Sequence, residues 1–421
     1  MLALFCLLAF VGLGVLYFQH WVVQKPFGIV LFIGEGFSPS RIAATRVFAG
    51  GADAPLAIES LPHSALLTNF SEDFANADSA AAASALATGV KVNNRSLSVD
   101  RDGKSLPTLL ELATAAGRAT GIVTDGRLTD ATLAAFYAHA PVTSDSATIA
   151  RQLAEQAKID VALGGGAEEF VPNDKGGHRS DGRDLLLELR RNGAEVVRTR
   201  SDLEAVPAWK RAKVVGAFAA TELGYSDEIN ARAAEPSLSD MVRRAIELLQ
   251  YNRAGYLLVV DAALMRKAAQ ENNGERTLNE TVEFDRAVAV AQRYVGGSST
   301  IIVCGDVAVG GLAMNGTPFR KDRGIAVLGL NSAGDPWLTW ASGPNGRRSY
   351  GASRLAETQP QASPSAEEPV THAPQEPAAF YAKSALNTVE DVVAFGSGAG
   401  TKALHGSLPN TAIFQIVRGE L

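Results

Sequence analysis

The chain has 421 residues, an apolar fraction of 46% and a formal net charge of −6. This composition predicts a globular protein, either one large α/β domain or two ordinary ones, and it excludes disorder for most of the chain. Without a basic stripe, the negative net charge argues against nucleic acid as a partner. The two cysteines, Cys6 and Cys304, predict neither an intrachain disulfide framework nor a cysteine-based zinc site.

The N-terminal stretch 2–23 is apolar apart from Gln19 and His20. A helix over it would extend roughly 30 Å, the thickness of a hydrocarbon core, whereas the apolar core of a signal peptide is usually about 7 to 15 residues long. No Ala-x-Ala cleavage pattern precedes Lys25. We therefore expect residues 1–24 to form an uncleaved membrane anchor, with a signal peptide as the alternative. Both interpretations export the rest of the chain to the periplasm or the extracellular space.

Residues 78–91 begin with Asp78 and Ser79 and continue as an alanine-rich run. Alanine is the best helix former, so a helix is predicted from this point. The free N–H groups and the positive dipole end of such a helix attract anions, and a phosphate could therefore bind at Ser79. Asp and Ser are also preferred helix N-caps, which is the alternative role for both residues.

Apolar runs alternate with helical stretches over the rest of the chain. Continuous apolar runs of this kind are typical of parallel strands buried on both faces, and they lie at 27–33, 119–124, 159–163, 255–261 and 300–306. Helices are predicted at 107–116 and 280–295. The alternation predicts an α/β domain over 25–421, with a mostly parallel central sheet and helices on both faces.

Residues 353–377 differ in composition from the rest of the domain, since they are rich in Pro, Ala, Glu, Gln and Ser. Such a segment cannot bury enough apolar surface to offset the entropy of ordering, and it is predicted to be a flexible insertion. Docking of a partner is the alternative to a solvated loop.

Three of the predicted strands end in a carboxylate, at Glu35, Asp261 and Asp306. Ligands of open α/β sheets bind outside the carboxyl ends of the strands, so these acids are expected to converge. Together with Asp130 and Thr132, at the end of another β segment, they predict a metal site made of hard oxygen ligands. Each acid alone could instead cap the helix that follows it.

Several blocks of the sequence resemble the alkaline phosphatases, in the order in which that family has them. The blocks are 28–36, 78–100, 128–139, 161–167, 280–285 and 390–411. They cover nearly everything after Lys25, so the resemblance implies the alkaline phosphatase fold. A shared fold does not by itself imply the activity. The resemblance also leaves room for a homodimer.

The resemblance further implies roles for single residues. Alkaline phosphatases use a serine nucleophile beside two zinc ions and one magnesium ion, with an arginine that clamps the phosphate. Ser79 resembles the nucleophile, Glu35 looks like the ligand shared by a zinc and the magnesium, and Asp306 resembles an aspartate ligand of zinc. Thr132 and Asp261 look like further magnesium ligands. The candidate metal ligands are therefore Glu35, Asp78, Thr132, Asp261 and Asp306.

Other positions depart from the family pattern. Histidines are expected where Gln270, Val307 and Asn387 stand, an aspartate where Arg266 stands, and the clamping arginine where Thr143 stands. Zinc prefers nitrogen and sulfur donors, so a catalytic pair of zinc ions is not expected here. The magnesium set keeps its oxygen donors, and the sequence therefore predicts one magnesium ion at most.

Arg266 would place a positive charge in the space that a zinc ion has in the family. A guanidinium attracts an anion but does not act as a Lewis acid. The alternative role of Arg266 is a simple ion pair with a nearby acid. We therefore predict that Ser79 and Arg266 bind a phosphate-like anion and that phosphomonoesterase activity is impaired or lost. The alternative is an active metal-dependent phosphomonoester hydrolase with Ser79 as nucleophile.

Overall fold

The computed structural model describes residues 2–17, 25–143, 145–155, 157–210, 213–228, 230–315, 328–330, 336–347 and 376–421. The first helix, α1 (Leu2–Tyr17), has 16 residues, and no helix in the described ranges combines the length and apolarity needed to cross a membrane. Residues 1 and 18–24 of the expected anchor and 353–375 of the expected insertion lie outside these ranges. Glu376 and Pro377, which end that insertion, lead into strand β13 (Ala378–Tyr381), and Glu376 is buried.

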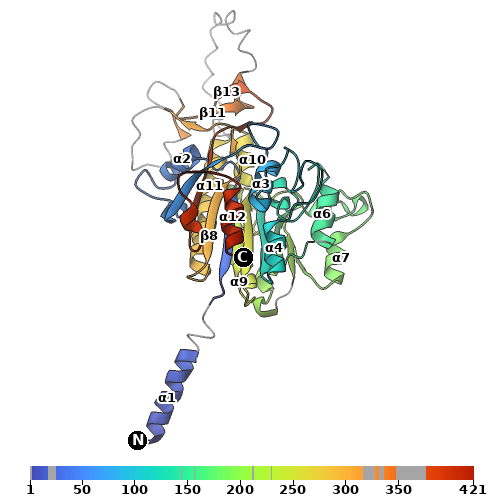
Figure 1. Cartoon of the computed structure of the whole chain (residues 1–421). Coiled ribbons are helices and arrows are strands. Elements are labelled where there is room, and N and C mark those ends of the chain that lie inside the picture. Colours follow the sequence, from blue (N-terminus) through green and yellow to red (C-terminus); the bar gives the residue numbers. More distant parts are fainter. Residues whose placement is uncertain are drawn as a thin grey trace, which may run out of the picture.

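A ten-stranded sheet forms the centre of the domain, in the order β16-β2-β15-β8-β1-β7-β3-β4-β6-β5 (Figure 1). Its strands are β1 (Gly28–Gly34), β2 (His63–Thr68), β3 (Ala119–Arg127), β4 (Val161–Gly165), β5 (Glu195–Val197), β6 (Val214–Ala217), β7 (Tyr256–Ala262), β8 (Thr300–Gly305), β15 (Val392–Ser397) and β16 (Ser407–Pro409). Only β15 runs antiparallel to its neighbours, β2 and β8, within this sheet. The predicted mostly parallel sheet is confirmed.

Both faces of the sheet are covered because successive side chains of each strand point to opposite sides. In β1, Ile29, Leu31 and Ile33 enter one apolar core, whereas Val30 and Phe32 enter the other. The first core is closed by α3 (Ser79–Thr88), α4 (Leu109–Ala115), α5 (Ala131–Ala134), α6 (Ser146–Glu155), α7 (Leu185–Arg191) and α12 (Ala412–Gly419). The second is closed by α2 (Pro39–Ala49), α8 (Arg200–Ala205), α9 (Leu238–Leu249) and α11 (Gly274–Tyr294).

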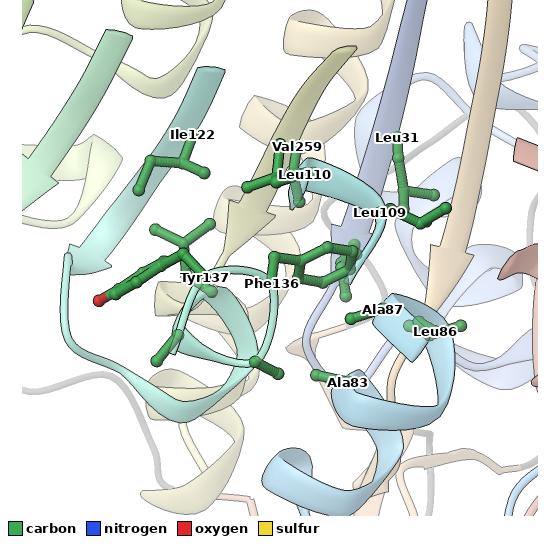
Figure 2. Close-up of a cluster of buried hydrophobic side chains, with 14 of the residues drawn as sticks. Leu31, Ala83, Leu86, Ala87, Leu109, Leu110, Ile122, Phe136, Tyr137 and Val259 are labelled. Carbon is green, nitrogen blue, oxygen red and sulfur yellow. The ribbon is translucent and has the colours of Figure 1, made fainter. Parts of the chain in front are cut away.

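The alanine-rich helix α3 lies entirely within the domain, with every residue from Ser79 to Thr88 buried. Its small side chains let it pack against α5 and α12, and Ala83, Leu86 and Ala87 meet Phe136 in the first core (Figure 2). The helix ends at Gly89, whose φ of 73° is a left-handed conformation that glycine adopts at little cost. Close packing on all sides therefore fixes the position of its first turn.

Smaller sheets lie beside the central one. Strands β10 (Ala313–Met314), β11 (Leu338–Gly343), β12 (Gly346–Arg347) and β13 form a four-stranded sheet, whereas β9 (Ala308–Val309) pairs with β14 (Asn387–Thr388). Helix α10 (Leu264–Gln270) follows β7 directly. Because β9 follows β8 and α10 follows β7, the β14 residue Asn387 comes close to both strand ends.

Candidate active site

A pocket of about 360 Å³ opens where β1, β3 and β7 end and α3 begins. Eight of the predicted positions line it: Glu35, Asp78, Ser79, Asp130, Thr132, Thr143, Arg266 and Gln270. Asp261 and Asp306 are buried behind this lining, at the ends of β7 and β8. The carboxyl ends of the strands therefore meet at one place, as the sequence predicts.

Ser79 is the first residue of α3, and its hydroxyl is directed at a carboxylate. Its Oγ donates a hydrogen bond of 2.6 Å to Oδ2 of Asp306. The other oxygen of Asp306, Oδ1, accepts a bond of 3.0 Å from the backbone N–H of Gly36. Asp306 is thus held between the turn after β1 and the start of α3.

Asp78 is the N-cap of α3. Its Oδ1 accepts a 2.9 Å bond from the N–H of Ala81, and its Oδ2 accepts a 2.7 Å bond from the N–H of Arg95. Both oxygens are committed to backbone donors, so Asp78 acts as a helix cap and is not arranged as the metal ligand that we expected. Asp306 and Glu35 do not cap helices, since the N-caps of α2 and α10 are Ser38 and Ala263.

The guanidinium of Arg266 lies between the carboxylates of Glu35 and Asp306. Its Nη1 is 3.7 Å from Oε2 of Glu35 and 3.8 Å from Oδ2 of Asp306. Its Nη2 donates a 3.2 Å bond to Oδ1 of Asn387, whose Nδ2 donates to the carbonyl of Ala77. The ion-pair role and the placement of a positive charge beside Ser79 are therefore both present in one arrangement.

Burial dominates the electrostatics of the carboxylates. It raises the pKa of Glu35 to about 8, with a further increase from the charge of Asp306 and an opposing effect of Arg266. Burial also raises the pKa of Asp261 well above its ordinary value, and the charge of Glu35 adds to this. Thr124 Oγ1 donates to Oδ2 of Asp261, while Oδ1 has no hydrogen-bond donor within the described part of the chain.

These donors fit one of the two metals that the resemblance implies. Glu35, Asp261 and Thr132 offer oxygen atoms, the ligands that Mg²⁺ prefers, and the unpaired Oδ1 of Asp261 is an acceptor without a partner. Zinc does not fit, because none of the described residues that line the pocket is a histidine or cysteine, and Val307 is buried in an apolar cluster. Across the described ranges, no three acidic, histidine or cysteine side chains are grouped as a metal site.

Arg41, on α2, is a buried cation that the sequence does not reveal as part of the site. Only 1% of it is exposed, and its Nη1 donates a 2.9 Å bond to the carbonyl of Glu35. Burial lowers its pKa to about 10, although the charges of Asp306 and Glu390 oppose this. An arginine in a helix is normally exposed at the surface, so the local sequence gives no sign that Arg41 is buried.

Two more cations, Lys267 and Arg127, line the pocket, and neither was predicted from the sequence. Lys267 forms an ion pair with Glu222. Arg127 lies 3.3 Å from the same carboxylate and 3.2 Å from Glu169. Both cations are therefore already neutralised by acids of the protein.

A family model described as "Alkaline phosphatase" matches residues 28–420, nearly the whole described domain. The chain belongs to the alkaline phosphatase family. The alkaline phosphatase of Escherichia coli K12 is 33% identical over 66% of this chain and 69% of its own length. That of Gadus morhua is 29% identical over 66% of this chain and 68% of its own length.

The fold of the alkaline phosphatases is confirmed by solved structures. Thermus thermophilus alkaline phosphatase superposes with a TM-score of 0.72 at 23% identity, covering 94% of this chain and 91% of its own. Thr143 and Gln270, which we predicted to stand in the places of the clamping arginine and a histidine, both line the pocket. The chain therefore has the fold of the family, and the substitution of its pocket residues stays a prediction.

Proposed function

We propose that this alkaline phosphatase family member binds a phosphate-type anion at Ser79 and hydrolyses phosphomonoesters slowly or not at all. The observation that carries the proposal is the guanidinium of Arg266, within 4 Å of both Glu35 and Asp306. A fixed cation there attracts an anion and takes up the space between the two acids. It does not activate a nucleophile as a metal ion would.

The binding half of the proposal is supported by the start of α3. The first N–H groups of a helix have no intrahelical acceptor, and Ser79 and Ala80, which carry the first two of them in α3, line the pocket. They add donors and the positive dipole end to the charge of Arg266. A tetrahedral anion would therefore meet hydrogen-bond donors from two elements.

The loss of turnover is supported by the surroundings of the Ser79 hydroxyl. The hydroxyl donates a hydrogen bond to Asp306, and the cation nearest to that carboxylate is Arg266, which cannot bind the Ser79 oxygen as a metal ion would. A serine hydroxyl without an activating metal ion or a poised general base is a weak nucleophile. Ser79 is therefore a poor nucleophile in this arrangement.

We include one magnesium ion in the proposal. Glu35, Asp261 and Thr132 would hold it, and when bound it would supply positive charge beside the anion. Zinc is left out because the donor set does not suit it.

The test is an assay of the purified full chain on p-nitrophenyl phosphate, with magnesium and zinc present, alongside calorimetric titration with inorganic phosphate. We expect phosphate binding that weakens roughly tenfold or more in Arg266→Ala, since a charged partner is removed. Unchanged phosphate affinity in Arg266→Ala would contradict the proposal.

Family membership and the position of Ser79 in the pocket favour a second candidate, an active metal-dependent phosphomonoester hydrolase. Metal-dependent turnover that disappears in Ser79→Ala would establish that candidate. Turnover that survives in Ser79→Ala would point to a contaminating enzyme instead.

We also propose that the domain is exported and held at a membrane by the N-terminal segment. In α1, the side chains of Leu4, Phe5 and Phe10 are 61%, 72% and 79% exposed, which suits an apolar environment. Retention in the membrane pellet after carbonate washing, with residues 1–24 still present by mass spectrometry, is the expected result. The homodimer that the family resemblance allows stays a prediction, to be checked by sedimentation.

A further inference from the structure

Arg95 is an unpaired cation next to the pocket. Its side chain is exposed, and its guanidinium makes no hydrogen bond, ion pair or ring contact with any residue in the described ranges. The cations that line the pocket are all engaged: Arg266 with Glu35 and Asp306, Lys267 with Glu222, and Arg127 with Glu169 and Glu222. Arg95 is thus available to an incoming anion without first leaving a carboxylate.

The backbone of Arg95 is fixed between two residues of the pocket wall. Its N–H donates a 2.7 Å bond to Oδ2 of Asp78, the residue before Ser79. Its carbonyl accepts a 2.9 Å bond from the N–H of Thr143. Asp78 and Thr143 both line the pocket, so the long side chain of Arg95 starts next to residues of its wall.

The conformation of Arg95 is costly for an arginine. Its φ is 68°, in the left-handed region where glycine is the favoured residue. A side chain in that region costs on the order of 1 kcal/mol. A glycine would fit the same turn without this cost, so an arginine stands here against the local backbone preference.

The pocket is predicted to lack the phosphate-clamping guanidinium of the family pattern, and Arg95 could supply a guanidinium from another loop. Thr143 stands where the family pattern has the arginine that clamps the phosphate, and threonine brings no charge. A guanidinium donates paired hydrogen bonds that fit the oxygens of a phosphate. The N–H of Thr143 donates to the carbonyl of Arg95. The side chain of Arg95 therefore leaves the backbone beside the position where the family has its clamping arginine.

We propose that Arg95 is the anion clamp of this protein and that its guanidinium binds the non-bridging oxygens of phosphate or a phosphomonoester held at Ser79. The inference rests on the proposed anion-binding function and names the residue that completes it. The bound anion would lie between Arg266, deep in the pocket, and Arg95, at its open side.

Titration of the purified full chain with inorganic phosphate tests the clamp through the variant Arg95→Gly. Affinity should fall roughly tenfold to a hundredfold, the loss expected for charge-assisted hydrogen bonds. The free energy of unfolding should stay the same or rise, because glycine tolerates a φ of 68°. The matched control is Arg253→Gly, an exposed arginine in the turn before β7, at the opposite end of that strand.

The outcomes separate the clamp from the proposed function. If phosphate binding depends on Arg266 but is unchanged in Arg95→Gly, the clamp is refuted while the proposed function stands. If Arg253→Gly weakens binding as much as Arg95→Gly, the effect is one of general charge, and the clamp is also refuted. If the wild-type chain binds no phosphate, both proposals fail.

Discussion

The turn after β1 brings Gly36 against the buried Arg41. A Cβ at Gly36 would lie 2.7 Å from Nη1 of Arg41, and the φ of Gly36 is +80°. The arginine has little freedom to move, since it is buried and bound to the carbonyl of Glu35. We expect Gly36→Ala to lower the free energy of unfolding by about 2–4 kcal/mol, from backbone strain and steric overlap together.

Gly103 provides the matched control for this substitution. Its φ of +76° is nearly the same, but no atom lies within 4 Å of a Cβ placed there. Gly103→Ala should therefore show the backbone cost alone, about 1 kcal/mol. Equal losses in urea denaturation of the two variants would show that Arg41 gives way easily and does not hold the turn.

The places of Glu35 and Asp306 after predicted strands suggested that these two acids converge, whereas the family resemblance was needed to place Ser79 beside them. Arg41 and Arg95 could not be predicted in the same way. Their importance comes from burial in one case and from a left-handed backbone in the other. Both properties depend on contacts between segments distant in sequence, which hydrophobic patterns do not record.

Helix α3 depends on Asp78 for its first turn and for the loop that carries Arg95. Asp78→Ala removes the bonds to the N–H groups of Ala81 and Arg95. Loss of an N-cap costs about 1 kcal/mol, and the second bond brings the expected loss to about 2 kcal/mol. Asp78→Asn keeps a capping oxygen and should lose less than half of that in chemical denaturation. A larger loss for Asn than for Ala would contradict the capping role.

Helix α11 carries a buried carboxyl group that makes stability depend on pH. Burial, followed by the charge of Asp125, raises the pKa of Glu280 from 4.5 to about 8. Its stabilising contribution is complete below pH 4.5 and is lost as the pH rises toward 8, because the unfolded chain ionises first. Glu280→Gln cannot ionise and keeps an oxygen that can accept from Ser226. The variant should therefore gain about 2–4 kcal/mol relative to wild type between about pH 5 and pH 9.

Glu275, an exposed residue near the start of the same helix, is the control. Glu275→Gln should leave the pH dependence of unfolding parallel to that of wild type. If Glu280→Gln also gives a parallel curve in urea titrations at a series of pH values, the Glu280 carboxyl is not the group that titrates.

The first residue of α11 could not be predicted from the apolar pattern of the sequence. The sequence predicted a helix from Glu280, whereas it begins at Gly274 with Asn273 as its N-cap. The side chain of Asn273 accepts from the N–H of Arg276, a signal that the apolar pattern does not contain. Strand β3 likewise continues past the predicted end to Arg127, where it pairs with Gly165 of β4.

The strand order of the central sheet determines that Glu35, Asp261 and Asp306 lie close together, which the sequence pattern could only suggest. β1 lies between β7 and β8, which come late in the chain, and this order brings Glu35 near both Asp261 and Asp306. Alternation of strands and helices predicts a parallel sheet but not its strand order, which depends on pairing between distant segments. The family resemblance, not the local pattern, made the meeting of these residues specific.

Magnesium and zinc should affect the unfolding of the whole domain differently. A ligand that binds only the folded state raises stability by mass action, so magnesium at a hundred times its dissociation constant adds about 2.7 kcal/mol. We expect magnesium to raise the unfolding temperature of the chelator-treated chain by a few degrees. Zinc should give no comparable shift, because Arg266 lies between Glu35 and Asp306 and the pocket lining contains no histidine or cysteine among the described residues.

Asp261→Asn separates this site from weak binding of magnesium to surface acids. The substitution removes the charge of the buried carboxylate whose Oδ1 has no donor in the described residues, and the magnesium shift should disappear. Asp102→Asn, at an exposed turn, should leave the shift intact. A zinc shift as large as that of magnesium would mean that imidazole-free oxygen ligands hold zinc in spite of Arg266. The charge of that arginine would then have to move away from the two acids, and the anion-binding proposal would lose its main support.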